Sequence, residues 1–265
     1  MKADFHMHTN FSTDSQMSPE EVIKRAIELG LKTICITDHQ DMDFPEPGFL
    51  VDFEKYFQVL PRLQEQYKNQ IDVRIGVELG LQLHLKEQLE KIEATYPFDF
   101  ILGSIHVLDG VDPHCGGYFA TRTDEAGFQE AFERTLDNLR YIKCFDVLGH
   151  MDYVVRYGHE KATHYSYQKY ADVIDEILRT LIQDGKGLEL NTAGLKYGIG
   201  FAHPHTDVLK RYRELGGEII TVGSDAHRPE HLAYEFAVAK DILLDCGFKY
   251  YTEFRARKPY FCALS

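Results

Sequence analysis

The sequence predicts an α/β fold in which seven parallel strands, each followed by a helix, close into a barrel. Short runs rich in apolar and β-branched residues alternate with longer stretches of helical periodicity, and the alternation repeats along the chain. No low-complexity tract or composition break separates the repeats. Strands that alternate with helices pair in parallel through right-handed crossovers, and seven such units favour a closed barrel. An open doubly wound sheet is the alternative, but no glycine-rich phosphate loop follows the first strand.

Length and composition agree with one such domain over residues 1–265. Apolar residues make up 44% of the chain and charged residues 27%, which is typical of a globular protein in water. No segment has the apolar length that a membrane span requires. The N-terminus runs directly into Asp4, His6 and His8, unlike a signal peptide. We therefore expect neither membrane attachment nor secretion.

Cysteine usage and net charge indicate the compartment and the partners. The five cysteines are odd in number, widely spaced and free of CxxC pairs, which indicates reduced thiols and a cytoplasmic protein. A net charge of −13 opposes the phosphate backbone of nucleic acids, so we expect no nucleic-acid partner. A small anionic substrate remains compatible with that charge, because bound divalent cations would reverse the local field.

The first helix and the second strand have the clearest local signals. Ser18, Pro19 and Glu21 form a capping box with proline at the first helical position, and Gly30 ends the helix that follows. The run 33–37 is short, β-branched and almost fully apolar, as in a strand covered on both faces.

The later units repeat this order. Further strands are expected at 73–77, 98–105, 145–149, 187–191 and 218–224, with a possible last strand at 249–254. Helices are expected at 52–68, 86–95, 124–141, 167–183, 207–215 and 229–245.

Histidine, aspartate or glutamate residues stand at the carboxyl ends of six of these seven strands. His6 and His8 are two residues apart on a strand, so both imidazoles lie on one face. In a parallel barrel all strand ends meet at one face, where active sites form. The residues expected to converge there are His6, His8, His39, Glu78, His106, His150, Asp225 and His227, with Asp14 from the loop after the first strand.

This pattern indicates a metal site. A single histidine at a strand end is usually an ordinary hydrogen-bonding residue, but independent accidents do not place such groups at six strand ends. Nine ligands exceed the needs of one ion, so two or three metals are expected, with Glu78 bridging two of them. Imidazole and carboxylate donors without thiolate suit Zn, Fe or Mn.

These motifs carry a resemblance to a known family. The order HxHT, Asp14, TDH, Glu78, GSIH, GHxD and SDAH resembles the polymerase and histidinol phosphatase (PHP) superfamily of metal-dependent phosphoesterases. The stretches at 149–152, 189–195 and 257–259 resemble its histidinol-phosphatase branch. Asp14 stands where some relatives have histidine.

The resemblance implies a distorted, TIM-like (β/α)7 barrel with a trinuclear metal centre at the C-terminal ends of its strands. The implied reaction is hydrolysis of L-histidinol phosphate to L-histidinol and phosphate, a step of histidine biosynthesis. The implied ligand sets are His6, His8, Glu78 and Asp225 for the first metal, Glu78, His106 and His150 for the second, and Asp14, His39 and His227 for the third.

In the implied mechanism, a hydroxide activated by two metals attacks phosphorus while the third metal neutralises charge on the phosphoryl oxygens. Glu78, Asp225 and Asp14 are the expected catalytic residues. Asp14 or a metal-bound water is the candidate proton donor for the leaving group. No phosphoenzyme is expected, because direct displacement needs no serine or cysteine nucleophile.

Four further residues are candidate substrate contacts. Arg156 follows the fifth strand by six residues, and its guanidinium can pair with two phosphate oxygens at once. Lys196, after the sixth strand, is a second candidate for the phosphate, and Tyr118 a candidate for the organic part of the substrate. Asn191 suits a hydrogen bond to substrate or to a metal ligand.

Three other functions share parts of this pattern. A phosphodiesterase or exonuclease of the same superfamily is disfavoured by the negative net charge. An amidohydrolase barrel shares the HxH opening but usually has a lysine at a middle strand end, where this chain has Glu78. A non-catalytic metal-binding barrel is disfavoured because no expected ligand is missing.

Overall fold

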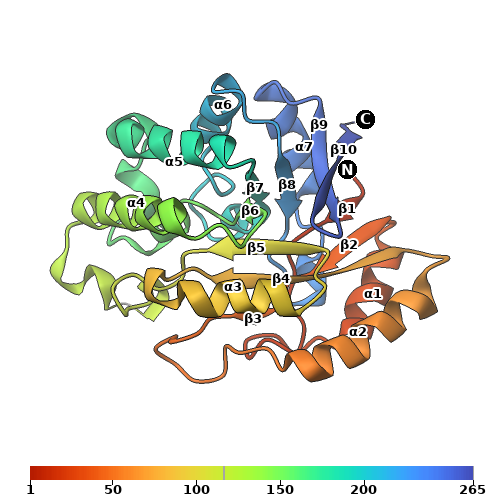
Figure 1. Ribbon diagram of the computed structural model, residues 1–265. Helices are drawn as coiled ribbons and strands as arrows, with labels where there is room; N and C mark the ends of the chain where they lie inside the picture. The colour runs from red at the N-terminus through yellow and green to blue at the C-terminus, as the bar shows by residue number, and fades with distance from the viewer. Residues whose placement is uncertain (116, 265) are drawn as a thin grey trace.

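Seven parallel strands form the barrel wall and pair with their neighbours in chain order in the computed structural model, which describes residues 1–115 and 117–264 (Figure 1). The strands are β1 (Ala3–Asp4), β2 (Thr33–Ile36), β4 (Asp72–Gly80), β5 (Phe100–Ser104), β6 (Val147–Leu148), β7 (Gly187–Asn191) and β8 (Ile220–Gly223). A short strand, β3 (His39–Gln40), pairs beside β2 along the same edge of β4. The predicted alternation of strands and helices is confirmed.

The first and last wall strands meet, so the sheet is nearly closed. The Phe5 amide donates to the Val222 carbonyl at 2.9 Å, and the Asp225 amide donates to the His6 carbonyl at 2.8 Å. Met7 forms a parallel bridge with Ala226 beyond these bonds. We call this junction the β1–β8 seam. The barrel prediction is therefore confirmed, and the open-sheet alternative is wrong.

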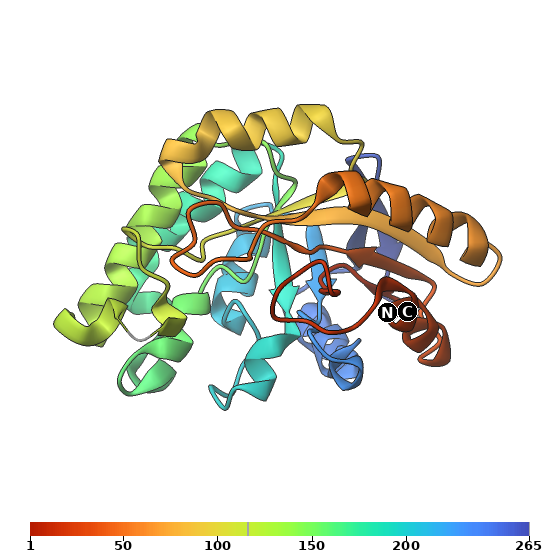
Figure 2. The same cartoon turned by 90° about the horizontal axis from the view of Figure 1, so that it is seen from below.

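Helices cover the outside of the wall (Figures 1 and 2). They are α1 (Pro19–Glu28), α2 (Phe53–Tyr67), α3 (Lys86–Thr95), α4 (Asp124–Tyr141), α5 (Ala171–Gln183), α6 (Thr206–Glu214) and α7 (Phe236–Asp245). The capping box of α1 is present: the Ser18 hydroxyl accepts from the Glu21 amide, and the Glu21 carboxylate accepts from the Ser18 amide. None of the helices in the described residues combines the length and hydropathy of a membrane span.

Two predicted helices begin later than their periodicity indicates. The segment 167–183 opens with a 3-10 turn, η6 (Tyr167–Tyr170), before α5. The segment 229–245 opens with another, η8 (Pro229–His231), and α7 follows only after Glu235, which has a positive φ of 52°. An apolar spacing of three residues fits a 3-10 turn as well as an α-helix, so the sequence did not separate the two.

A C-terminal hairpin packs beside β8. Its strands are β9 (Tyr250–Arg255), which was predicted, and β10 (Lys258–Ala263), which was not. Arg257 at its turn pairs with Asp146 and with Glu93, the latter at 3.0 Å, and so ties the tail to the barrel. Both views place the two chain ends next to each other (Figures 1 and 2).

The buried side chains at the two ends of the barrel differ in chemical type. Toward the amino ends of the strands, the Phe5 and Phe100 rings meet edge to face at 5.4 Å, and Phe254 of β9 lies 5.1 Å from Phe100. Toward the carboxyl ends, the buried side chains become histidines and carboxylates. The aromatic half supplies the apolar burial, and the polar half holds the candidate site.

Replacing Phe5 with Ala tests the aromatic half. The side chain is buried, and its loss should lower the free energy of unfolding by about 3–5 kcal/mol through lost burial and a residual cavity. Urea unfolding followed by circular dichroism measures the change. The control is Phe261→Ala on β10, where the side chain is 50% exposed and a change within about 0.5 kcal/mol is expected. Equal effects of the two variants would show that Phe5 is not a core residue.

Candidate metal centre

The structure brings the nine predicted ligand residues together at the carboxyl ends of the strands. His6 and His8 flank Met7, whose bridge to Ala226 fixes the backbone there, and their Nε2 atoms lie 3.1 Å apart. His106 and His150 follow β5 and β6, and their Nε2 atoms lie 3.4 Å apart. Strand alternation thus delivers imidazoles from opposite walls to one point.

Glu78 lies at the centre of the site, near the end of β4, and is fully buried. Its Oε1 atom lies 3.0 Å from His150 Nε2 and 3.3 Å from His106 Nε2. Its Oε2 atom lies 3.2 Å from His6 Nε2, 3.5 Å from His8 Nε2 and 3.1 Å from His39 Nδ1. The two oxygens of one carboxylate therefore face two separate groups of imidazoles.

A third group lies closer to solvent. Asp14 Oδ2 lies 3.1 Å from His227 Nε2 and 3.6 Å from His39 Nε2. Asp225 Oδ1 lies 3.4 Å from His8 Nε2 and 3.5 Å from His227 Nδ1, so it joins this group to the His6–His8 pair. The Asp225 backbone has φ 52°, a left-handed conformation that aspartate tolerates better than most residues and that accompanies functional sites.

Burial and mutual charge shift the pKa values of these groups in opposite directions. Burial lowers the pKa of His106, but the Asp41 and Glu78 carboxylates outweigh it and raise that pKa to about 10. Burial, with the neighbouring His227 and His39, lowers the pKa of His8 to about 3. Burial raises the pKa of Glu78, yet the imidazoles around it hold that pKa well below its ordinary value. Glu78 is therefore an anion that requires positive charge around it.

The donor set fits bound divalent cations. His39 Nδ1 and Glu78 Oε2 are buried without a hydrogen-bond partner among the described residues, an arrangement that costs about 1–3 kcal/mol per group. Facing nitrogen pairs beside a carboxylate oxygen are the arrangement that a cation between them would satisfy. The ligand atoms of His6, His8 and Glu78, and those of Glu78, His106 and His150, lie within 4.8 Å of one another.

Sequence reasoning missed two carboxylates that hold the histidines in place. Glu189 of β7 is buried, its Oε1 lies 2.7 Å from His6 Nδ1, and its Oε2 accepts from the His150 amide at 2.8 Å. Asp41 is buried and lies 2.9 Å from His106 Nδ1. A glutamate inside an otherwise apolar strand, and an acid two residues after His39, were the available signals.

Glycines make room for both carboxylates. A Cβ atom on Gly223 would lie 2.3 Å from Glu189 Oε1 and from His6 Cβ, and one on Gly80 would lie 1.9 Å from Asp41 Oδ1. Glycine at these two strand ends is therefore required for Glu189 and Asp41 to pack against the histidines.

An open cavity of about 650 Å³ lies above the metal-ligand residues. The Arg156 guanidinium lines it and stacks on the rings of Tyr153, Tyr157 and Tyr197 at 4.6, 4.7 and 4.1 Å. The described residues supply Arg156 with these aromatic partners but with no carboxylate partner. Its charge is therefore available to an anion in the cavity.

The other predicted substrate contacts lie elsewhere. The Tyr118 prediction is wrong: the side chain is fully buried, and its hydroxyl donates to the Gly127 carbonyl at 2.8 Å. Lys196 Nζ donates to the Ser224 carbonyl at 3.4 Å beside the cavity-lining residues. Asn191 is buried behind His6, with its Nδ2 atom 3.2 Å from Glu189 Oε2, and so acts on the ligands and not on the cavity. Tyr118 and Lys196 lie outside the strands, where no two-residue period fixes the direction of a side chain.

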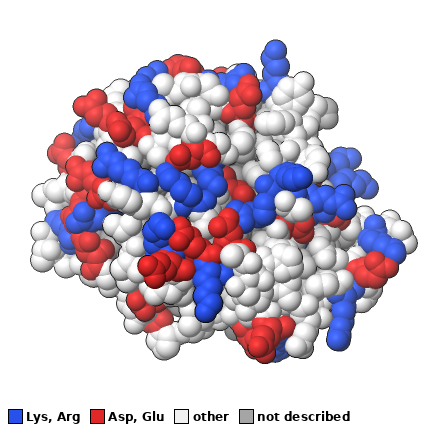
Figure 3. Space-filling model, in the orientation of Figure 1, with Lys and Arg blue, Asp and Glu red and all other residues white. Residues whose placement is uncertain are grey.

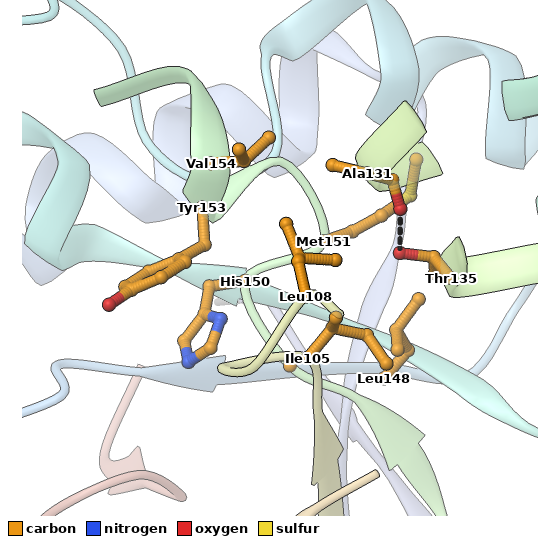
Figure 4. Close-up of a pocket in the computed structure, with 10 residues that line it drawn as sticks. Ile105, Leu108, Ala131, Thr135, Leu148, His150, Met151, Tyr153 and Val154 are labelled. Atoms are coloured by element: carbon orange, nitrogen blue, oxygen red, sulfur yellow. Dashed lines mark hydrogen bonds between the residues drawn. The ribbon is translucent and has the colours of Figure 1, made fainter. Parts of the chain in front are cut away.

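Apolar packing supports the β6 end of the site (Figure 4). Leu108, Leu148 and Met151 fill one side of this close-up, while the Tyr153 hydroxyl and the His150 imidazole point to the other. The His150 ring lies 5.1 Å from the Tyr153 ring. This packing fixes both polar groups at the cavity wall.

Fold and site together define an α/β barrel with a candidate metal-binding site at the carboxyl ends of its strands. The family model for the PHP domain matches residues 4–193. The chain belongs to the PHP domain family.

Two curated relatives extend over nearly the whole chain. The histidinol-phosphatase of Lactococcus lactis is 31% identical and covers 97% of this chain and 96% of its own. A protein of Clostridium acetobutylicum named "Probable histidinol-phosphatase" is 35% identical over 94% of this chain and 95% of its own. The crystal structure of the Lactococcus lactis histidinol phosphate phosphatase, complexed with zinc, L-histidinol and phosphate, superimposes with a TM-score of 0.90 at 31% identity, covering 98% of each chain.

Replacing Glu189 with Gln tests whether this carboxylate supports the candidate metal ligands. The amide keeps the shape of the side chain but loses the charge that holds His6 Nδ1, so zinc affinity should fall by about 10–100-fold. Chelator competition followed by metal analysis measures the affinity. Glu87→Gln, an exposed glutamate on α3, is the matched control and should bind zinc as the unmodified protein does. Unchanged zinc affinity in Glu189→Gln would exclude this role.

Proposed function

We propose that the protein is a metal-dependent phosphomonoesterase that hydrolyses L-histidinol phosphate to L-histidinol and phosphate, a step of histidine biosynthesis. The observation that carries the proposal is the position of the Arg156 guanidinium, which faces the cavity above the nine clustered ligand residues without a carboxylate partner among the described residues. A relative that is similar over its full length contains zinc, L-histidinol and phosphate. The spaced, unpaired cysteines support a cytoplasmic location.

We further propose three divalent metal ions, with zinc as the first choice and iron or manganese as alternatives that suit the same donors. Glu78 supports this number, because its two oxygens face different imidazole groups and Asp14, His39 and His227 form a third. When bound, such ions supply Lewis acidity, which lowers the pKa of water and neutralises charge on phosphoryl oxygens.

The chain's own residues select and orient the ester. Arg156 can hold two phosphoryl oxygens through a bidentate, charge-assisted contact. The outer part of the cavity carries Phe44 and Phe49 together with Glu46 and Asp112. Aromatic rings beside carboxylates suit a planar, cationic organic group, and histidinol carries an imidazole and an ammonium group.

The face of the molecule in Figure 3 gives no support to a nucleic-acid substrate. Lys and Arg side chains are interspersed with Asp and Glu side chains on the face in Figure 3. The net charge of −13 opposes a polyanion and favours a small ester.

The direct test is phosphate release from L-histidinol phosphate by the purified protein loaded with zinc, manganese or ferrous iron. We expect a kcat/KM of at least about 10⁴ M⁻¹s⁻¹ and its loss after chelation. Phosphoserine and a short oligonucleotide serve as competing substrates. If every metal form leaves histidinol phosphate intact while one of the other esters is hydrolysed, the substrate assignment is wrong.

Replacing Arg156 with Ala tests the phosphate contact. Loss of two charge-assisted hydrogen bonds should lower kcat/KM by roughly 10²–10⁴-fold and weaken inhibition by inorganic phosphate. Arg156→Lys keeps the charge without the planar fork and should recover only part of the loss. The control is Arg134→Ala, which removes an exposed arginine that pairs with Asp109 outside this cavity. Unaltered phosphate inhibition in Arg156→Ala would exclude the contact.

A further inference from the structure

A chain of hydrogen bonds runs from the protein surface to the cavity wall. His114, in the exposed η2 turn (Pro113–Cys115), lies with Nδ1 3.2 Å from the Tyr157 hydroxyl. The Tyr157 hydroxyl donates to the Tyr153 hydroxyl at 3.1 Å, and both tyrosines belong to η4 (Tyr153–Tyr157). Tyr153 lines the cavity, with its ring 5.1 Å from the His150 ring and 5.8 Å from the His106 ring.

These hydrogen bonds do not involve the hydroxyl proton of Tyr153. Tyr153 accepts from Tyr157, so its own O–H proton is not part of that bond. Among the described residues, no acceptor takes this proton. Tyr153 lines the cavity, and its hydroxyl points away from the apolar side chains of Leu148 and Met151 (Figure 4).

The Tyr153 ring also stacks against Arg156, the residue proposed to contact phosphate. The Arg156 guanidinium lies over the Tyr153 ring at 4.6 Å, so an ester held by Arg156 has its phosphoryl group close to the phenol. Tyr153 and Arg156 are three residues apart on a 3-10 turn, where side chains at that spacing eclipse. The local helix therefore sets the distance between the anion contact and the proton donor.

We propose that Tyr153 is the catalytic acid that protonates the leaving alcohol, with Tyr157 and His114 returning the proton to it; the proposal rests on the phosphomonoesterase function above. As the phosphorus–oxygen bond to the alcohol breaks, its electron pair stays on the alcohol oxygen, which takes the proton of the Tyr153 hydroxyl. Tyr153 then takes the proton of Tyr157, and Tyr157 takes that of His114 Nδ1. The attacking water forms the new phosphorus–oxygen bond as hydroxide, and the proton that it releases to solvent restores exposed His114. The sum is water plus ester giving alcohol plus phosphate.

Other polar groups near the cavity are less suited to this role. Asp14 Oδ2 lies 3.1 Å from His227 Nε2 and 3.6 Å from His39 Nε2, so this oxygen already faces two imidazoles. Arginine does not release its proton in proteins, which excludes Arg156. Burial raises the pKa of the Tyr153 phenol well above its ordinary value near 10, so the group is protonated at neutral pH, and a departing alkoxide is a strong base that can take its proton.

The test compares two leaving groups in Tyr153→Phe. The alcohol of histidinol phosphate needs a proton as it leaves, whereas 4-nitrophenolate is stable as an anion. We expect kcat for histidinol phosphate to fall by about 10²-fold or more, and kcat for 4-nitrophenyl phosphate to change by less than about threefold. Metal content and the inhibition constant of inorganic phosphate should stay unchanged, because the variant removes one hydroxyl and keeps the ring under Arg156.

Further variants separate a relay from a structural role. Tyr157→Phe removes the bond to Tyr153 and should lower the alkyl-ester rate alone, by about tenfold, since general acid catalysis as a whole contributes about 10²–10⁴-fold. His114→Gln should act in the same direction. The matched control is Tyr170→Phe, where the ring is buried against Phe132 at 5.5 Å outside the cavity-lining set, and neither rate should change.

The outcomes are distinct. Equal losses for both esters in Tyr153→Phe, or a phosphate inhibition constant that weakens in step with kcat, would overturn the acid role and leave the phosphatase function standing. A protein that ignores histidinol phosphate but hydrolyses another alkyl ester would overturn the substrate assignment. The acid role is then decided on that alkyl ester by the same comparison.

Discussion

The site depends on one buried negative charge, the carboxylate of Glu78. A carboxylate without water around it is costly unless positive charge and hydrogen-bond donors replace the water. Five imidazoles from four other parts of the wall provide these groups, and each of the two carboxylate oxygens faces its own set. Ser104 adds a hydroxyl that donates to Oε1 at 2.6 Å. Strand β4 places this anion among the candidate ligand residues of the other strand ends.

The convergence of the nine candidate ligand residues was predictable from the sequence because eight of them stand at strand ends. The two-residue period of a strand fixes which face a side chain occupies. The sequence alone therefore defines the direction of an HxH pair or of Glu78 near the end of its strand. The carboxylates that hold the histidines in place, Glu189 and Asp41, were harder to predict. Glu189 occupies one position of an apolar strand, and only the contact with His6, far away in sequence, shows its role. Tyr118 was misplaced because a loop has no period, and β10 was missed because its residues are exposed and lack alternating burial.

The segment from His150 to Arg156, which follows β6 and runs into the 3-10 turn η4, combines three tasks. His150 belongs to the ligand set, Tyr153 and Arg156 face the cavity, and each follows the last by three residues. Buried Asp152 anchors the segment: it accepts from the His203 ring and, at 2.8 Å, from the His205 amide of the segment that follows β7. His203 and His205, which lie away from strand ends, thus hold in place the turn that contains Tyr153 and Arg156.

The β1–β8 seam has a consequence for how the protein is made. Its ligand residues come from opposite ends of the chain, since His6 and His8 are synthesised first, while Asp225 and His227 are synthesised near the end. Bringing them together closes a loop that spans most of the chain, and the entropy cost of that closure precedes any stability gained from the contact. A metal ion that binds both sides of the seam favours the closed barrel by mass action, because the unfolded chain offers no such set of donors. Metal supply during growth should therefore set the yield of folded protein as well as its activity.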